Sequence, residues 1–174
     1  DIAGLDYKDI ELIKNLHQSD ELKIRIYAMI SDNDENFSYF IDSIGQPIIL
    51  PKLTVRSFKF FADGSLGSRG ACLIKPYSDL NNNHYGQILA DIKEYKSKLN
   101  LLYEYGFQAC THAIGDSANR QILNLYSEVL KSGNDFRWRV EHAQCVSPND
   151  IHFFRDFNII PSVQPTHATS DFIW

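Results

Sequence analysis

Two histidines have equivalent places in this sequence, each at the end of an apolar segment and just before a helix-start signal. His112 ends the segment of residues 107–112, and His142 ends the segment of residues 138–142. Neighbouring strands lie about 4.8 Å apart, so two imidazoles at their ends can bind one divalent ion through bonds of roughly 2.1 Å. Each histidine can also be no more than a polar residue at a strand end, but the repeated placement favours a metal site.

Lys59 is a third residue whose surroundings point to chemistry, because it is flanked by phenylalanines in the apolar run of residues 55–63. A lysine in such a run must be paired, uncharged or modified. An uncharged lysine can take up carbon dioxide and become a carbamate, which is an anionic metal ligand. The residues alone favour the simpler alternative, in which the ammonium group reaches solvent from the other face of the strand.

Three further residues are weaker candidates for a site. Asp63 precedes a glycine and can hold a substrate, a metal or only a turn. Asp116 begins a predicted helix, where capping is the simpler role. His167 ends a predicted strand, as His112 and His142 do. Cys110 precedes His112 by two residues and should face the same side one layer deeper, where a packed thiol is the simpler reading.

These residues are positioned by strands and helices that alternate with short connections. Alternation of this kind predicts parallel βα units. The residues between 64 and 90 form an exceptionally long connection, which is typical of functional or disordered loops. The predicted helices are 6–18, 91–106, 116–133 and 147–158, the predicted strands are 22–30, 55–63, 107–112, 138–142 and 159–167, and residues 31–54 are predicted as a loop or ragged helix.

The fold is therefore either an open doubly wound sheet or a (β/α)8 barrel. No dinucleotide-binding fingerprint follows any strand, which weakens the first choice. In a barrel the catalytic side chains lie at the carboxyl ends of the strands, where the three histidines are predicted. The glycine-rich segment 64–70 lacks the lysine and spacing of a P-loop, so phosphate binding is a weak third hypothesis.

Composition narrows the class of protein. The 174 residues are 44% hydrophobic, which suits a globular domain with a core, and the net charge of −5 argues against nucleic-acid binding. No apolar run is long enough to span a bilayer, and no leader peptide is evident. The three cysteines, an odd number, indicate free thiols in a reducing compartment, and we expect a cytoplasmic protein without membrane or nucleic-acid partners.

Four segments together resemble the amidohydrolase superfamily, and most closely its metal-dependent hydrolases related to D-aminoacylase and N-substituted formamide deformylase. They are "KFFADGSLGSRGACLIKPY", "GFQACTHAIGDSANRQIL", "RWRVEHAQCVSPNDI" and "IIPSVQPTHATSD". The resemblance implies a (β/α)8 barrel with one or two divalent metal ions, zinc above all, and hydrolysis of a small amide-type substrate. It implies that His112 and His142 are the metal ligands of strands five and six and that Lys59 is the carboxylated lysine of strand four. His167 and Asp63 match less defined positions near the substrate.

Two parts of the family's pattern are missing from these residues. No His-x-His pair, which the family carries on strand one, occurs in the sequence, and neither does the strand-eight aspartate. With about five predicted strands, we expect residues 1–174 to be the central part of a barrel, roughly strands three to seven. Such a piece should be inactive alone and should self-associate through its exposed sheet edges. A non-catalytic binding or assembly domain on the same scaffold is the alternative.

Overall fold

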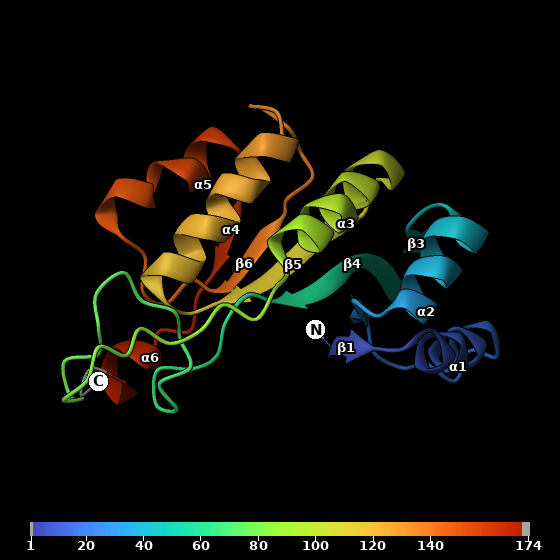
Figure 1. Ribbon diagram of the computed structural model, residues 1–174. Helices are drawn as coiled ribbons and strands as arrows, with labels where there is room; N and C mark the ends of the chain where they lie inside the picture. Colours follow the sequence, from blue (N-terminus) through green and yellow to red (C-terminus); the bar gives the residue numbers. More distant parts are fainter. Residues whose placement is uncertain (1, 172–174) are drawn as a thin grey trace. The chain divides into compact units, whose positions relative to one another are not determined.

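The computed structural model describes residues 2–171 and contains an open α/β sheet (Figure 1). Seven strands within that range follow the order β1-β2-β4-β5-β6-β7, with β3 beside β4. The pairings β1–β2, β2–β4 and β6–β7 are parallel, and β3 is antiparallel to β4. The predicted fold class, an α/β sheet corresponding to part of a (β/α)8 barrel, is confirmed. The strands are β1 (Ile2–Leu5), β2 (Ile26–Ser31), β3 (Ile48–Ile49), β4 (Leu53–Phe61), β5 (Gln108–Ala113), β6 (Arg139–His142) and β7 (Ile160–Ser162).

The chain divides into two compact units, which we describe separately. The described part of the first unit comprises residues 2–60 and 100–110, and that of the second comprises residues 61–99 and 111–171. The helices are α1 (Tyr7–Gln18), α2 (Asp34–Phe37), a π-helix (Ser38–Ile44), α3 (Ile92–Tyr105), α4 (Asp116–Val129), a 3-10 turn (Pro148–Asp150), α5 (His152–Asp156) and α6 (His167–Ser170). None of the helices in residues 2–171 is long and apolar enough to cross a membrane.

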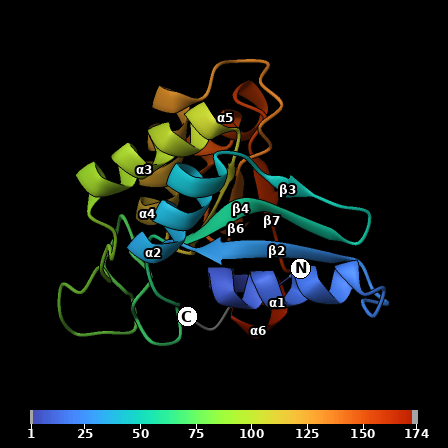
Figure 2. The same cartoon turned by 90° about the vertical axis from the view of Figure 1, so that its right-hand side faces the viewer.

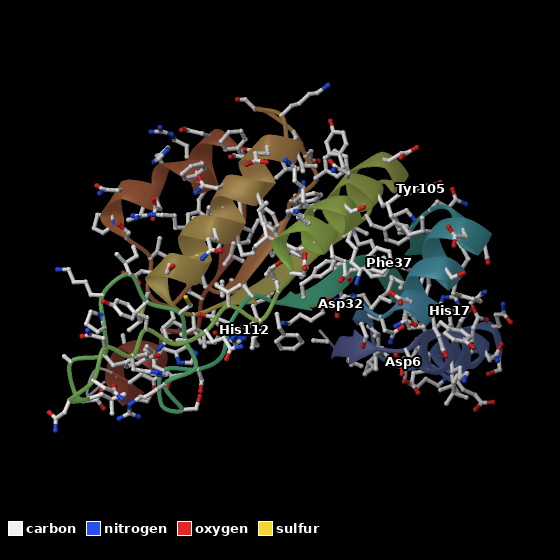
Figure 3. The ribbon with its side chains drawn as sticks, viewed as in Figure 1. Asp6, His17, Asp32, Phe37, Tyr105 and His112 are labelled. Carbon is white, nitrogen blue, oxygen red and sulfur yellow. The ribbon has the colours of Figure 1, made fainter. Side chains whose placement is uncertain are left out.

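Aromatic side chains form the core of the first unit. Phe58 of β4 packs against Phe37, labelled in Figure 3, and against Phe107, with ring centroids 4.4 and 5.4 Å apart. These tilted and edge-on contacts are the favourable arrangements for aromatic rings. Asp6 holds the N-cap position of α1, but its carboxylate accepts hydrogen bonds from the side chains of Asn33 and Asn36 and makes no capping bond.

The prediction of the first 54 residues was the least accurate. The short strand β1 was missed because three of its four residues are exposed and its glycine interrupts the strand pattern. The predicted loop at residues 31–54 contains α2, the π-helix and β3. The predicted strand 22–30 begins only at Ile26, and Ala28, Met29 and Ile30 are all buried, as expected of a parallel strand covered on both faces. The structure thus has seven strands in its described residues, where about five were expected.

The second unit is built around α4, which begins and ends close to the predicted positions. Tyr126 of α4 packs edge-on against Trp138, with ring centroids 4.9 Å apart, and both side chains are fully buried. The Tyr126 hydroxyl shares a hydrogen bond of 2.6 Å with Thr111 of β5 and so ties the helix to the strand. The connection of residues 62–91 extends beyond the end of α4 in both views (Figure 2).

Candidate functional site

Asp63, the second residue after β4, is a buried carboxylate that joins two segments of the second unit. Its Oδ1 accepts a hydrogen bond from the backbone N–H of Ile114 (3.0 Å). Its Oδ2 accepts from those of Gly115 (2.8 Å) and Cys72 (2.9 Å). Burial raises the pKa of Asp63, although the three N–H groups act in the opposite direction. Asp63 therefore fastens the connection of residues 62–91 to the turn that follows β5.

The same connection supplies the cap of α4. Gly115 is the N-cap, and a Cβ atom there would come within 2.0 Å of the carbonyl oxygen of Cys72. That carbonyl accepts hydrogen bonds from Ser117 and Ala118, the second and third helical residues. Asp116, predicted as a cap, instead accepts a hydrogen bond from the backbone of Ile74 (2.8 Å). The predicted capping role of Asp116 is wrong because the connection's backbone occupies that position.

The glycine-rich segment 64–70 uses its amides within the protein. The N–H of Gly64 donates to the carbonyl of Gly70, and the N–H groups of Gly70 and Ala71 donate to that of Ser65. Leu66 and Ala71 also pack with Tyr77 and Ile114 in a small apolar cluster. These amides and those of Ser117 and Ala118 already have protein acceptors, which counts against the phosphate-binding hypothesis.

His112 and His142 lie next to each other at the carboxyl ends of β5 and β6. Their ring centroids are 4.7 Å apart and their planes meet at 74°. Figure 3 labels His112 at the end of β5, beside the connection of residues 62–91. The Nε2 atom of His112 lies 3.2 Å from the carbonyl oxygen of Gly64 and 3.6 Å from Oδ1 of Asp63. The distance between the rings is small enough for both to bind one ion.

The backbone turns sharply at His142. His142 and Ala143 both have positive φ angles, 73° and 42°, which are uncommon for residues other than glycine. Such backbone conformations cost of order 1–3 kcal/mol each and often occur at functional sites. The ring of His142 is held by a hydrogen bond of 2.6 Å between its Nδ1 and Oε1 of Gln164.

His167 is the third histidine of the group, but it does not end a strand. β7 ends at Ser162, and His167 is the first residue of α6. The predicted strand 159–167 was too long because the chain turns at residues 165 and 166. The ring of His167 nevertheless lies 5.8 Å from that of His142, and its Nδ1 is 2.8 Å from Oδ2 of Asp171. The predicted convergence of the three histidines is therefore reached by a different local structure.

Asp171 completes this arrangement. Its pKa is lowered by hydrogen bonds from Ser170, His167 and Gln144, so it is a carboxylate at neutral pH. A cavity of about 330 Å³ lies beside it, with His142, Gln164 and His167 in its wall. The remaining wall residues are mainly apolar: Leu66, Ala143, Val163, Pro165 and Ala168. Apolar walls with a few convergent polar groups are typical of small-molecule sites.

The chain matches the model of the amidohydrolase family over residues 4–174. It belongs to the amidohydrolase family. Two solved structures share the fold of this amidohydrolase chain, with TM-scores of 0.84 and 0.83 and 28% and 25% sequence identity. Both are described as uncharacterized metal-dependent hydrolases, from Pyrococcus horikoshii OT3 and Pyrococcus furiosus. They align with 98% and 97% of this chain, which covers 34% of each of them.

Two curated relatives match part of this amidohydrolase. "Protein LONG AFTER FAR-RED 3" of Arabidopsis thaliana is 39% identical over 115 residues, 65% of this chain. "Putative amidohydrolase YtcJ" of Bacillus subtilis (strain 168) is 32% identical over 124 residues, 71% of this chain. The aligned segments represent 20% and 23% of the two relatives. The chain thus corresponds to about a fifth of the curated relatives and a third of the solved structures.

The side chains around His112 and His142 provide only some of the ligands that a metal ion needs. Within residues 2–171 no group of three or more His, Cys, Asp and Glu side chains is arranged to hold an ion. The pair His112 and His142 provides two imidazoles. Nδ1 of His142 is hydrogen-bonded to Gln164, and metal-binding histidines usually have such a partner on the nitrogen that does not bind the metal. Burial raises the pKa of the neighbouring Cys145 thiol, which is therefore a poor thiolate donor. The residues present fit a partial ligand set.

Lys59 belongs to the first unit and is buried, with 7% of its surface exposed. Its Nζ donates a hydrogen bond of 3.0 Å to the backbone carbonyl of Phe60. The hypothesis that its ammonium group extends into solvent is wrong, because the side chain is enclosed. A buried lysine is costly as a free cation, so a modified or paired state is favoured. Its carboxylation stays a prediction.

Proposed function

We propose that the protein to which this chain belongs is a metal-dependent hydrolase that cleaves carbon–nitrogen bonds in small amide-type molecules. The observation that carries this proposal is the adjacent pair His112 and His142, at the carboxyl ends of neighbouring strands of an amidohydrolase. The names of the Pyrococcus structures, both metal-dependent hydrolases, support it.

His112 and His142 would hold a divalent ion, with Lys59 as a further ligand if it is carboxylated. Imidazole donors suit zinc, with iron, manganese and nickel as alternatives. A bound ion of this kind supplies a Lewis acid that polarises a carbonyl group and makes a nearby water acidic. This chemistry suits amides, ureas, N-formyl groups and cyclic imides alike.

The chain's own residues supply the surroundings of this reaction. Asp63 fixes the turn after β5, and through it the position of His112. Leu66, Val163 and Pro165 provide an apolar part of the wall of the cavity beside His142. His167 lines the same cavity and would exchange a hydrogen bond with a substrate. Asp116 has no part in this proposal, because its carboxylate binds the backbone of Ile74.

Within the family, we place the parent protein with the cytoplasmic enzymes related to D-aminoacylase and N-substituted formamide deformylase. This finer assignment rests on the four sequence segments that resemble that branch. Residues 1–174 would then form the central part of the barrel. Such a part should show no hydrolysis alone and should self-associate through its sheet edges.

The alternative is a binding or assembly domain that retains the amidohydrolase scaffold. Absence of the strand-one His-x-His pair and of the strand-eight aspartate from the complete protein would favour this alternative. A hydrolysis assay on a longer protein that contains this chain separates the two, using amide, urea, N-formyl and cyclic imide substrates with zinc present. We expect hydrolysis of at least one class, and its loss in His112→Ala and His142→Ala. Correctly folded, zinc-loaded longer protein without activity on every class would support the scaffold alternative.

A further inference from the structure

The hydrogen bonds around Gln164 determine which of its amide atoms faces His142. The Nε2 group of Gln164 lies 3.2 Å from the backbone carbonyl oxygen of Ser162. A carbonyl oxygen only accepts hydrogen bonds, so the amide nitrogen must face it. The amide oxygen of Gln164 must then face His142, at 2.6 Å from its Nδ1.

The orientation of Gln164 in turn determines the proton position on His142. An amide oxygen only accepts hydrogen bonds, so Nδ1 of His142 must carry a proton. In the neutral ring the other nitrogen, Nε2, then carries a lone pair. This lone pair is the group that can bind a cation or accept a hydrogen bond.

His167 is fixed by a second, separate set of contacts with the same result. Its Nδ1 lies 2.8 Å from Oδ2 of Asp171, which is ionised and therefore only an acceptor. The same oxygen accepts a hydrogen bond of 2.8 Å from Nε2 of Gln144, which holds the carboxylate in place. His167 must therefore also carry its proton on Nδ1.

We propose that Gln164 and Asp171 are positioning residues that fix His142 and His167 as Nδ1–H tautomers, so that both rings present an unprotonated Nε2 at one cavity. The proposal goes beyond the ligand pair, because it assigns the reactive nitrogen and names the residues that select it. Its consequence for metal affinity rests on the proposed function, whereas the tautomers themselves do not.

The test is the tautomer of each ring in the 174-residue chain, read from long-range proton–nitrogen NMR spectra of ¹⁵N-histidine-labelled protein at a fixed pH of about 8.5, which is about two units above the pKa of free histidine. Signals are assigned by comparison with His142→Gln and His167→Gln. We expect both rings to show a protonated Nδ1 and a bare Nε2. A protonated Nε2 on His142 in the unaltered chain would overturn the proposal, whatever the variants do.

Two variants serve as each other's control. In Gln164→Met, His142 should lose the Nδ1–H signature while His167 keeps it. In Asp171→Ala, the pattern should be reversed. An unchanged His142 signature in Gln164→Met, with that of His167 intact, would show that Gln164 does not select the tautomer. If the Nδ1–H signature of His167 is also lost in Gln164→Met, the substitution has disturbed the whole cavity. The spectrum of the unaltered chain then decides whether the proposed tautomers are correct.

Zinc titration of the same samples separates this proposal from the proposed function. Residues that orient metal-binding histidines are typically worth 10–100-fold in affinity, so Gln164→Met should weaken zinc binding by about that factor. Nδ1–H tautomers in a chain that binds no zinc would leave the positioning roles standing and count against the metal site. Zinc binding in a chain whose His142 is protonated on Nε2 would support the metal site and overturn the positioning role of Gln164.

Discussion

The imidazole rings of His112 and His142 lie edge to face, with centroids 4.7 Å apart, at the ends of two successive strands. Each ring is held from outside the pair, His112 beside Gly64 and His142 by Gln164. The two side chains are therefore positioned independently of any ligand. This arrangement is the basis of the proposed metal-dependent activity.

Replacing Asp63 should destabilise the second unit, because two buried N–H groups and one partly buried N–H group depend on its carboxylate. In Asp63→Asn, an NH₂ group replaces one acceptor oxygen and faces N–H groups that then lack a partner. We expect a loss of about 2–4 kcal/mol in the free energy of unfolding, measured by urea denaturation. Asp79→Ala is the control in the same connection: Asp79 forms a partly exposed ion pair with Arg69 and should cost less than about 1 kcal/mol. Equal losses in the two variants would contradict the structural role of Asp63.

Gly115→Ala tests the close approach between the connection and α4. The new Cβ would lie 2.0 Å from the carbonyl oxygen of Cys72, so the backbone must move. We expect a loss of more than about 3 kcal/mol in unfolding free energy. Gly133→Ala is the matched control, since that site has a φ of +73° but nothing within 4 Å of the new Cβ, and backbone strain alone should cost about 1–2 kcal/mol. A well-tolerated Gly115→Ala would show that the connection does not pack on the helix in this way.

Tyr77 should make stability fall at high pH. Burial, with the charge of Asp63 as a smaller cause, raises the pKa of Tyr77 to about 12 from the ordinary value of 10. The folded state therefore favours the neutral hydroxyl, which donates a hydrogen bond to the carbonyl of Ala71. The stabilisation is fully present below pH 10 and is lost as the pH rises through 12.

Tyr77→Phe isolates this effect from the other groups that titrate in the same range. At pH 8 the variant should be less stable by about 1 kcal/mol, because it lacks the hydrogen bond to Ala71. The difference should shrink above pH 10, since only the unaltered chain has Tyr77 to ionise. Thermal unfolding of both proteins between pH 8 and 12 measures it. A difference that stays constant over this range would be inconsistent with the raised pKa.

The regular part of the fold could be predicted from the sequence because its signals are local. Apolar periodicity and capping signals located α4 to within a few residues, and the strand ends at His112 and His142 followed from them. β1 and β3 gave no such signal, since they are short and largely exposed. Their strand conformation comes from pairing with β2 and β4, which are distant in the sequence.

The residues of the candidate site also differ in how readily the sequence alone reveals them. The histidines were found by their equivalent places in the sequence, whereas Gln164 was missed, because an amide following a strand has no distinctive pattern. His167 is the first residue of α6, and Asp171 lies four residues after it. This helical spacing could have predicted their hydrogen bond. The role of Asp63 depends on three N–H groups from two segments and could be recognised only once the chain is folded.

The most direct test of the central claim is zinc content, measured by elemental analysis of the purified 174-residue chain after gel filtration in zinc-containing buffer. The proposal predicts about one zinc ion per chain above the buffer level, lost in His112→Ala and in His142→Ala. His152→Ala, on the exposed side of α5, should retain it. No zinc in the folded, unaltered chain, or equal zinc in all four proteins, would contradict a metal site formed by His112 and His142.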